Sequence, residues 1–283
     1  MNAICDLHTH SIFSDGSYTP AELLDAAVSA GISAIALTDH NTTDGLPDML
    51  AAARDREIEV VLGTEFSVDY QGTELHVLGL FIDPSHFARV SALMQEVNRR
   101  KEESNVQLIA SLAGVGVLLD YEAIKASTPK GMINRAHIAA AMIQKGYVQS
   151  RKEAFAGYLS TEAGHYREPE RLTVWQILDF IREIGAVPVL AHPLLNLTAG
   201  RLTEFLPLAK AAGLVGMECY YSTYDEEKIA LSLRLASEHG LICSGGSDFH
   251  GEAKPDISLG IGRGTLRVPY ACYQALKNAA ENM

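Results

Sequence analysis

Short apolar runs of β-strand character alternate with helical patterns along most of the chain. AICDL is followed by PAELLDAAVSAG, ISAIALTDH by DGLPDMLAAARDRE, and the run IEVVLGTEF comes next. The same rhythm returns later as TVWQILDFIREIG, AVPVLAH, a helical stretch over 201–212, LVGMECYY, a further helix and LICSGGSDFH. Strands and helices in this order predict an α/β fold in which a parallel sheet closes into a (β/α) barrel.

Two segments interrupt this alternation. After Val68, two strands flank Gln71, Gly72 and Thr73, which predicts a hairpin. A long helix is expected from about Phe87. Between 102 and 171 the strand rhythm is absent, and short helical segments alternate with turn-rich stretches such as TPKGM and EAGHYREPE. We therefore predict a barrel made of residues 1–101 and 172–283, and a helical insertion over 102–171 that forms a substrate cap.

The composition limits where such a chain works and what it binds. Its 283 residues are 47% hydrophobic, which suffices for a buried core, and the four cysteines lack CxxC spacing and are typical of buried thiols. No apolar run reaches the roughly 20 residues that span a bilayer, and the N-terminus lacks a basic leader, so we expect a cytoplasmic protein without membrane contact. The net charge of −12 argues against binding duplex nucleic acid but leaves small anionic substrates open.

Histidines and carboxylates gather where the predicted strands end. They are His8, His10, Asp39, His40, Glu65, His192, Asp248 and His250, with His76 on the predicted hairpin. Because the carboxyl ends of parallel strands meet at one rim of a barrel, these side chains are expected to lie close together. A single histidine in such a place is usually a hydrogen-bonded rim residue. So many ligand-type residues at successive strand ends indicate a metal site.

The residue types restrict the metal. Imidazole and carboxylate groups without thiolates suit zinc, manganese or iron, and these side chains outnumber the ligands that one zinc ion takes. A cluster of ions is therefore predicted. Glu65 is the leading candidate for a carboxylate that bridges two of them.

The same positions form the motifs DLHTHSIFSDG, LTDHNTTDG, AHP and GSDFHG. With these motifs in this order, the chain resembles the PHP (polymerase and histidinol phosphatase) family of metal-dependent phosphoesterases. The first motif's HxH alone would also admit the amidohydrolases. The resemblance spans most of the chain and implies the distorted (β/α)7 barrel of that family.

Carried over by position, the resemblance implies a ligand set for each of several metal positions. One position takes His8, His10, Glu65 and Asp248, a second takes Glu65, His76 and His192, and a third takes Asp15, His40 and His250. Asp39 is more often a supporting group in this family, so it is left out of the ligand set. The implied cofactors are two or three divalent ions, with manganese favoured and zinc or iron as alternatives.

A cluster of this kind predicts a mechanism without a side-chain nucleophile. A hydroxide held between two cations attacks phosphorus at neutral pH, and the cations offset the charge that develops on the phosphoryl oxygens. The leaving oxygen needs a proton, and His192 or His250 could supply it only if that residue is not a metal ligand. The acid is left unassigned.

The insertion carries NRAH at the start of an apolar helical pattern. Asn134, Arg135 and His137 are either an anion site at a helix start or a helix cap with an exposed arginine. Bacterial PHP proteins with an inserted helical subdomain resemble 3',5'-nucleoside bisphosphate phosphatases and 5'-3' exonucleases of short RNA. That resemblance implies a phosphate site remote from the metals, for which Arg135 and His137 are the candidates.

CYYSTYD follows a later strand and adds Tyr221, Ser222 and Tyr224. These side chains either contact phosphate or stack on a base, or they are ordinary core and rim residues.

Several functions compete at this point. The favoured one removes the 3'-phosphate of a nucleoside 3',5'-bisphosphate to leave a 5'-nucleotide, with exonuclease action on short oligonucleotides as an extension. A histidinol-phosphate-type phosphatase and an amidohydrolase that cleaves C–N bonds are the alternatives on the same barrel, and a non-catalytic metal-binding module is a third. The full ligand set argues against the non-catalytic module. No obligate protein partner is predicted.

Overall fold

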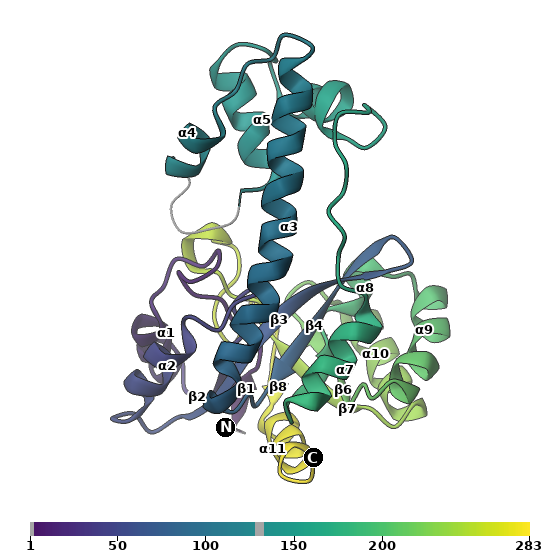
Figure 1. Ribbon diagram of the computed structural model, residues 1–283. Helices are drawn as coiled ribbons and strands as arrows, with labels where there is room; N and C mark the ends of the chain where they lie inside the picture. Colours follow the sequence, from purple (N-terminus) through teal and green to yellow (C-terminus); the bar gives the residue numbers. More distant parts are fainter. Residues whose placement is uncertain (1–2, 128–132) are drawn as a thin grey trace. The chain divides into compact units, whose positions relative to one another are not determined.

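The computed structural model describes residues 3–127 and 133–283 (Figure 1). The chain divides into two compact units, Met1–Ser91 with Leu172–Met283 and Ala92–Arg171, which we call the barrel unit and the helical unit. The first boundary lies within one long helix, and the boundary expected at 101/102 lies further along that same helix. The predicted turn TPKGM, residues 128–132, lies outside the described residues.

The barrel unit contains a single mixed sheet of eight strands in the order β7-β6-β5-β4-β3-β2-β1-β8. The strands are β1 Ile4–Asp6, β2 Ile32–Leu37, β3 Glu59–Tyr70, β4 Thr73–Leu80, β5 Val187–Leu190, β6 Gly216–Tyr221, β7 Ile242–Gly246 and β8 Val268–Pro269. β1, β2 and β3 pair in parallel, as do β5, β6 and β7. The predicted (β/α) barrel is therefore confirmed, and it is distorted because β4 runs antiparallel to both of its neighbours.

Backbone hydrogen bonds bring the segment after β7 beside the segment after β1. The N–H of Leu7 donates to the carbonyl of Gly245 over 3.1 Å, and the N–H of Asp248 donates to the carbonyl of His8 over 2.9 Å. A Cβ on Gly246 would overlap the backbone of His8, so only glycine permits this approach. The first and last motifs are thus joined at one place on the barrel rim.

The predicted hairpin is the β3–β4 pair, with Asp69 opposite Glu74 and Tyr70 opposite Thr73. Gln71 and Gly72 form the two-residue turn with φ values of 53° and 77°. Positive φ at both central positions is the requirement of the tight turns that match strand twist. One expectation was wrong in detail: β3 does not end at Glu65 but continues to Tyr70, because β4 supplies it with a partner beyond the rim.

Helices surround the sheet in the barrel unit (Figure 1). They are α1 Pro20–Ser29, α2 Leu46–Ala53, α7 Val174–Glu183, α8 Pro193–Asn196, α9 Ala199–Ala211, α10 Glu226–Glu238 and α11 Tyr270–Ala280, with short 3-10 turns at Pro84–His86 and Gly251–Ala253. Local sequence explains several starts, since Thr19 with Glu22 and Thr173 with Gln176 form capping boxes. The helical stretches anticipated from periodicity are present as α1, α2, α7, α9 and α10.

The sequence patterns did not anticipate the last helix. α11 contacts β1, β2, β5, β7 and β8. A helix that touches strands from both sides of the sheet must cover one end of the barrel. Its Tyr273 and Leu276 join the core made by side chains of these strands, such as Ala36 and Val189.

The helical unit has a core of its own. Its elements are the greater part of α3 Phe87–Ala113, with α4 Tyr121–Ala126, α5 Arg135–Gln144, α6 Arg151–Ala154 and a π-helical turn at Phe155–Leu159. Leu108, Leu112, Ile138, Met142 and Leu159 are fully buried together. The long helix expected from Phe87 is confirmed as α3.

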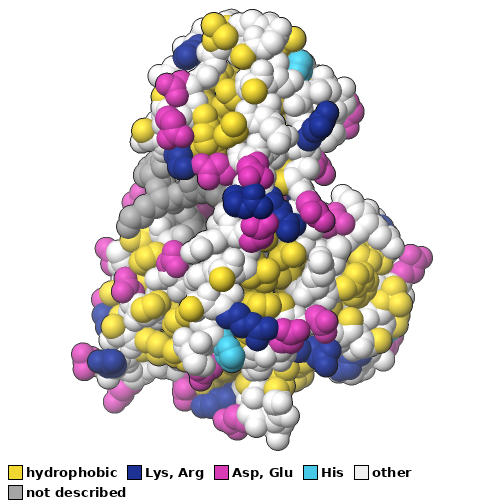
Figure 2. Space-filling model, in the orientation of Figure 1, with side chains coloured by type: hydrophobic (Ala, Val, Ile, Leu, Met, Phe, Trp, Pro, Cys, Tyr) yellow, Lys and Arg dark blue, Asp and Glu magenta, His cyan; other side chains and the backbone are white. Residues whose placement is uncertain are grey.

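Basic and acidic side chains are interspersed over the visible face of each unit (Figure 2). Among the described residues of that face there is no broad area of a single charge sign. No described helix is both long and apolar enough to cross a bilayer.

Candidate metal centre

All nine metal-ligand candidates lie in the barrel unit, and contacts link them into one network. His8 and His10 follow β1, His40 follows β2, Glu65 is on β3 and His76 on β4. His192 follows β5, Asp248 and His250 follow β7, and Asp15 lies in the loop between β1 and α1. Seven of the nine side chains are less than a fifth exposed, whereas those of His40 and Asp15 are 26% and 57% exposed.

Glu65 lies at the centre of the group. Its Oε2 is 3.1 Å from His8 Nε2, 3.3 Å from His10 Nε2 and 3.1 Å from His40 Nδ1. Its Oε1 is 2.7 Å from His76 Nδ1 and 3.0 Å from His192 Nε2. One carboxylate therefore offers a different oxygen to each of two sets of imidazoles. This is the geometry expected of a carboxylate that bridges two cations.

Ligand atoms converge in three overlapping groups whose members lie within 4.8 Å of one another. The groups are His8, His10, Glu65 and Asp248; His10, Asp15, His40 and His250; and His40, Glu65 and His76. The first coincides with the first expected metal position. The second adds His10 to the expected third position, and His192 joins the cluster through Glu65.

The hydrogen bonding of the buried atoms fits bound cations. Within the described residues, His10 Nδ1 and His192 Nδ1 have no hydrogen-bond partner, while Glu65 Oε2 and His250 Nε2 contact other members of the cluster at 3.1–3.3 Å. Such unsatisfied buried polar atoms are costly, and they gather here in one place. His250 Nδ1 donates to the backbone carbonyl of Asp248 over 2.8 Å, so Nε2 is the nitrogen that can bind a cation. A divalent cation bound within the cluster would satisfy Glu65 Oε2 and His250 Nε2.

The electrostatics point the same way. Burial alone would lower the pKa of His10, but hydrogen bonds to Asp248 and Glu65 raise it to about 9. Burial alone would raise the pKa values of Glu65 and Asp248, but the charge of His8 and other imidazoles holds both well below their ordinary range. The carboxylates stay ionised and hold protons on His10 and His76, whereas burial lowers the pKa of His40 to about 4. Cations would take the place of those protons, because metal ligands bind in their deprotonated form.

Two of these residues have a strained backbone. His192 has φ 27° and Asp248 has φ 56°, both in the left-handed region that disfavours residues with a Cβ. Strain of this kind persists only where the surroundings hold it, and it is concentrated at functional sites. Each residue lies two positions after the end of a strand, His192 after β5 and Asp248 after β7.

Asp248 is also held by two groups outside the ligand set. The hydroxyl of Tyr221 donates to Asp248 Oδ2 over 2.7 Å, and Lys254 Nζ lies 2.8 Å from the same oxygen. The other oxygen, Oδ1, lies 3.1 Å from His10 Nε2. The carboxylate thus presents only Oδ1 to the cluster.

Asp39 has the supporting position that was expected of it. It accepts hydrogen bonds from the backbone N–H of Ser11 (2.7 Å) and from the hydroxyls of Ser11 and Ser14 (2.6 Å each). These bonds anchor the loop that carries Asp15, whose Oδ1 lies 3.2 Å from His250 Nε2.

Two buried carboxylates were not identified from sequence. Glu218 on β6 contacts His8 and His192, and Asp6 on β1 accepts hydrogen bonds from the N–H and hydroxyl of Ser247. Both side chains are fully buried. The available signal was a charged residue within an otherwise apolar strand, as in LVGMECYY, because a buried carboxylate needs partners.

The other predicted site residues make contacts within their own units. Tyr224 accepts a hydrogen bond from the N–H of Leu194, and Ser222 donates one to the carbonyl of Ser247. Tyr221 and Tyr224 also line a small hollow of about 170 Å³ together with Arg267. Aromatic faces and a guanidinium are compatible with a planar ligand.

In the helical unit, Asn134 is the N-cap of α5 and His137 completes a capping box with it. The guanidinium of Arg135 stacks 4.1 Å from the ring centroid of Tyr166 and donates to the carbonyl of Leu159 over 2.9 Å. His137 instead lines a hollow of about 570 Å³ between α4 and α5. Residues two positions apart in an α-helix are about 200° apart around its axis, so Arg135 and His137 face different ways.

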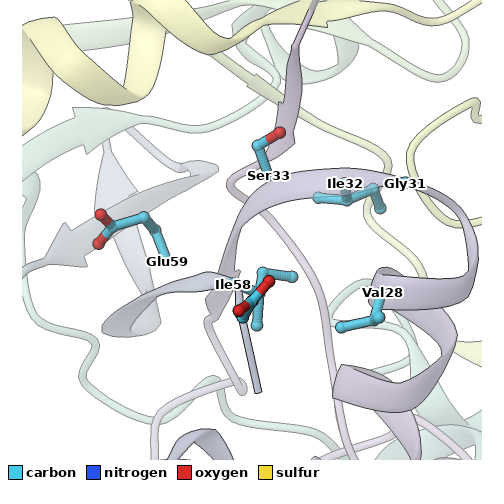
Figure 3. A pocket seen from close by; sticks show the side chains of 7 residues that line it. Val28, Gly31, Ile32, Ser33, Ile58 and Glu59 are labelled. Atoms are coloured by element: carbon cyan, nitrogen blue, oxygen red, sulfur yellow. The ribbon is translucent and has the colours of Figure 1, made fainter.

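A further hollow lies where β2 and β3 begin (Figure 3). Val28, Ile32 and Ile58 line it with the carboxylate of Glu59. It is at the opposite strand ends from the cluster, and it contains no imidazole.

A (β/α) barrel whose rim collects buried imidazoles and carboxylates defines a class of protein, the metal-dependent hydrolases. The model of the PHP domain matches residues 6–165, and the chain belongs to the PHP family. The 3',5'-nucleoside bisphosphate phosphatase of Chromobacterium violaceum is 34% identical over 259 residues, which are 89% of this chain and 90% of that protein. The 5'-3' exoribonuclease of Haemophilus influenzae is 32% identical over 246 residues, 87% of this chain and 89% of that one.

A solved structure from Bifidobacterium adolescentis, described as a candidate metal-dependent phosphoesterase, superposes with a TM-score of 0.76. It is 25% identical, and the match covers 97% of this chain and 95% of that chain. The protein is thus a metal-dependent hydrolase that acts on phosphate esters, and its His, Asp and Glu clusters suit divalent cations.

Proposed function

We propose that this protein removes the 3'-phosphate of nucleoside 3',5'-bisphosphates, giving a 5'-nucleotide and phosphate, and that it also degrades short oligonucleotides in the 5'-3' direction. One observation carries the proposal. Two relatives named for these activities match the chain over spans longer than the barrel unit alone, so the likeness includes part of the helical unit.

The proposed metal positions are those implied by the family motifs. One ion is held by His8, His10, Glu65 and Asp248, a second by Glu65, His76 and His192, and a third by Asp15, His40 and His250. Manganese is the favoured metal, with zinc or iron as alternatives, because imidazole and carboxylate ligands without thiolate suit all three. Metal analysis of the purified protein, and reconstitution with each metal in turn, tests this assignment.

When bound, such ions supply the Lewis acidity that polarises a phosphoryl oxygen and makes a water molecule nucleophilic at neutral pH. Other residues of this chain orient the proposed metal ligands. Tyr221 and Lys254 orient Asp248, the Asp248 carbonyl selects the tautomer of His250, and Asp39 anchors the loop of Asp15. Preorganised groups of this kind lower the cost of reaching the transition state.

Arg135 is the proposed contact for the 5'-phosphate. Tyr166 and Phe155 support its guanidinium on their ring faces, and one of its five N–H donors is used by the Leu159 carbonyl. A half-buried guanidinium that is held by two rings and has donors remaining suits bidentate phosphate binding. Asn134 and His137 support this contact through the cap of α5. The faces of Tyr221 and Tyr224 are the proposed base contact, with Ser222 beside them.

The substrate is proposed to be a free nucleotide or a short single strand, and the location the cytoplasm. Duplex nucleic acid and membranes are not expected partners. Cell fractionation and a comparison of single- with double-stranded oligonucleotides test both points.

The decisive experiment measures phosphate release from adenosine 3',5'-bisphosphate, 3'-AMP, 5'-AMP and histidinol phosphate, with an amide substrate as a negative control. Manganese-loaded wild type, Arg135→Met and Arg135→Lys are compared, and Lys152→Ala serves as a matched loss of charge in the same unit. We expect a preference for the bisphosphate that Arg135→Met removes through a higher KM, and that Arg135→Lys partly retains. Equal turnover of 3'-AMP by wild type would refute the bisphosphate proposal.

A further inference from the structure

Glu218 is the buried carboxylate that connects residues of two proposed metal positions. Its Oε1 lies 3.0 Å from His8 Nδ1, and its Oε2 accepts a hydrogen bond of 2.7 Å from the backbone N–H of His192. The Glu218 side chain has no exposed surface. None of the three ligand groups includes Glu218, so its contacts reach the cluster through other residues.

The chemistry of the first contact is directional. Carboxylate oxygens accept hydrogen bonds, so in its contact with the Glu218 carboxylate His8 donates from Nδ1, the nitrogen that faces it. The opposite nitrogen, Nε2, is the one that lies 3.1 Å from Glu65 Oε2 and 3.6 Å from Asp248 Oδ1. Glu218 therefore selects the ring orientation and tautomer in which His8 presents Nε2 to the other ligands.

The second contact acts on the backbone. His192 has φ 27° and ψ 52°, a conformation that needs support from its surroundings. The hydrogen bond from its N–H to Glu218 holds the residue in place while Nε2 lies 3.0 Å from Glu65 Oε1. A bulge in β6 between Glu218 and Tyr220 accompanies this arrangement.

We propose that Glu218 is a positioning residue that couples two metal positions: one carboxylate sets the tautomer of His8 and supports the strained backbone of His192. The inference rests on the proposed function, in which His8 and His192 are ligands of different ions. Loss of Glu218 then weakens both positions together, although Glu218 binds neither ion.

The substitution Glu218→Gln tests this sharply. The shape is kept, but the amide has one oxygen and one NH₂ group, so one of its two contacts becomes donor against donor. Zinc affinity is measured stepwise by competition with a chelator in wild type, Glu218→Gln, Glu218→Leu, His8→Ala and His192→Ala. We expect Glu218→Gln to weaken one of the first two binding steps, and Glu218→Leu, which removes both acceptor oxygens, to weaken both, each by about ten- to a hundred-fold, as loss of such partners typically does.

Leu276→Ala controls for a general loss of stability. Leu276 is fully buried on α11 in the barrel core and is not among the cluster residues, so its truncation should lower stability but leave both affinities unchanged. A second measurement needs no mutant: in zinc-loaded wild type, nitrogen NMR of labelled histidine should find the His8 proton on Nδ1.

The outcomes separate the possible failures. If Glu218→Gln binds zinc as wild type does, or if zinc sits on His8 Nδ1, the positioning role is overturned. If Glu218→Leu weakens only one step, the coupling is overturned. If His8→Ala and His192→Ala also leave zinc binding unchanged, the ligand assignment itself fails, and the error lies in the proposed function rather than in Glu218.

Discussion

Lys254 Nζ lies 2.8 Å from Asp248 Oδ2, on the side of the carboxylate that faces away from His10. An ammonium beside a metal-binding carboxylate repels incoming cations while it neutralises their ligand. We therefore expect Lys254→Met to tighten metal binding by about tenfold at low salt, a modest gain because the lysine side chain is 41% exposed and partly screened. Chelator competition measures this change. Lys254→Arg keeps the charge and should keep the wild-type affinity, whereas weaker binding by Lys254→Met would mean that orientation of Asp248 outweighs repulsion.

Glu65 contacts imidazoles through both of its oxygens. Metal binding should therefore depend more on the charge of Glu65 than on that of any other residue. We expect Glu65→Gln to lower both the bound metal and kcat by at least about a hundredfold, since it removes a proposed direct ligand rather than an outer partner. Glu59→Gln is a matched control. It makes the same change at the start of the same strand, where Glu59 accepts a hydrogen bond from Tyr273 far from the cluster. Normal metal content in Glu65→Gln would contradict its central role.

Metal removal should destabilise the barrel unit selectively. The chain has a single tryptophan, Trp175, which packs 5.8 Å from the rings of both Tyr70 and Phe205 in the barrel unit. Its fluorescence therefore reports unfolding of that unit. A ligand at a hundred times its Kd adds about 2.7 kcal/mol, which corresponds to a Tm shift of about 5–11 °C for a unit of this size. We expect EDTA to lower the Trp175 transition by that amount and manganese to restore it. An unchanged transition would count against metal binding in the barrel.

The reactivity of the cysteines can be predicted independently of the proposed metal cluster. Cys243 is half-buried while the other three are buried, and a hydrogen bond from Cys219 lowers the pKa of Cys243 in spite of partial burial. Because the thiolate is the reactive form, the rate of alkylation rises with pH and levels off above the pKa. We expect Cys243 to react first with iodoacetamide, with a half-maximal rate below the pH of about 8.5 that is typical of free cysteine.

Two variants check that cause. Cys219→Ala removes the donor and should move the half-maximal rate of Cys243 to higher pH. Cys219→Ser keeps a hydroxyl donor and should not. Equal behaviour of the two variants would exclude the hydrogen bond as the reason.

Local patterns were enough to predict the barrel and the identity of the cluster. Strand and helix periods are properties of a few adjacent residues, and the end of a parallel strand is a fixed place on a barrel rim. His8, His40, His192 and Asp248 could therefore be assigned to one rim before any contact was known. The length of β3 could not be predicted in this way, because its continuation past Glu65 depends on pairing with β4.

Arg135 and His137 show a limit of prediction from local sequence patterns. NRAH read as a string joins the two side chains into one anion site, whereas the helix that it starts turns them to different faces. The adjacency of residues in a sequence says little about the direction of their side chains until the element that holds them is defined.

The primary structure alone thus accounts for the fold class, the family and the nine ligand candidates, since each of these depends on residue type and local period. Tertiary structure alone places Glu218 against His8, 210 residues away, and Lys254 against Asp248. Those contacts depend on sheet register, on the bulge in β6 and on the left-handed turn at Asp248, which arise only when distant strands pair. Ligand identity is a local property, whereas ligand orientation is set by the closed barrel.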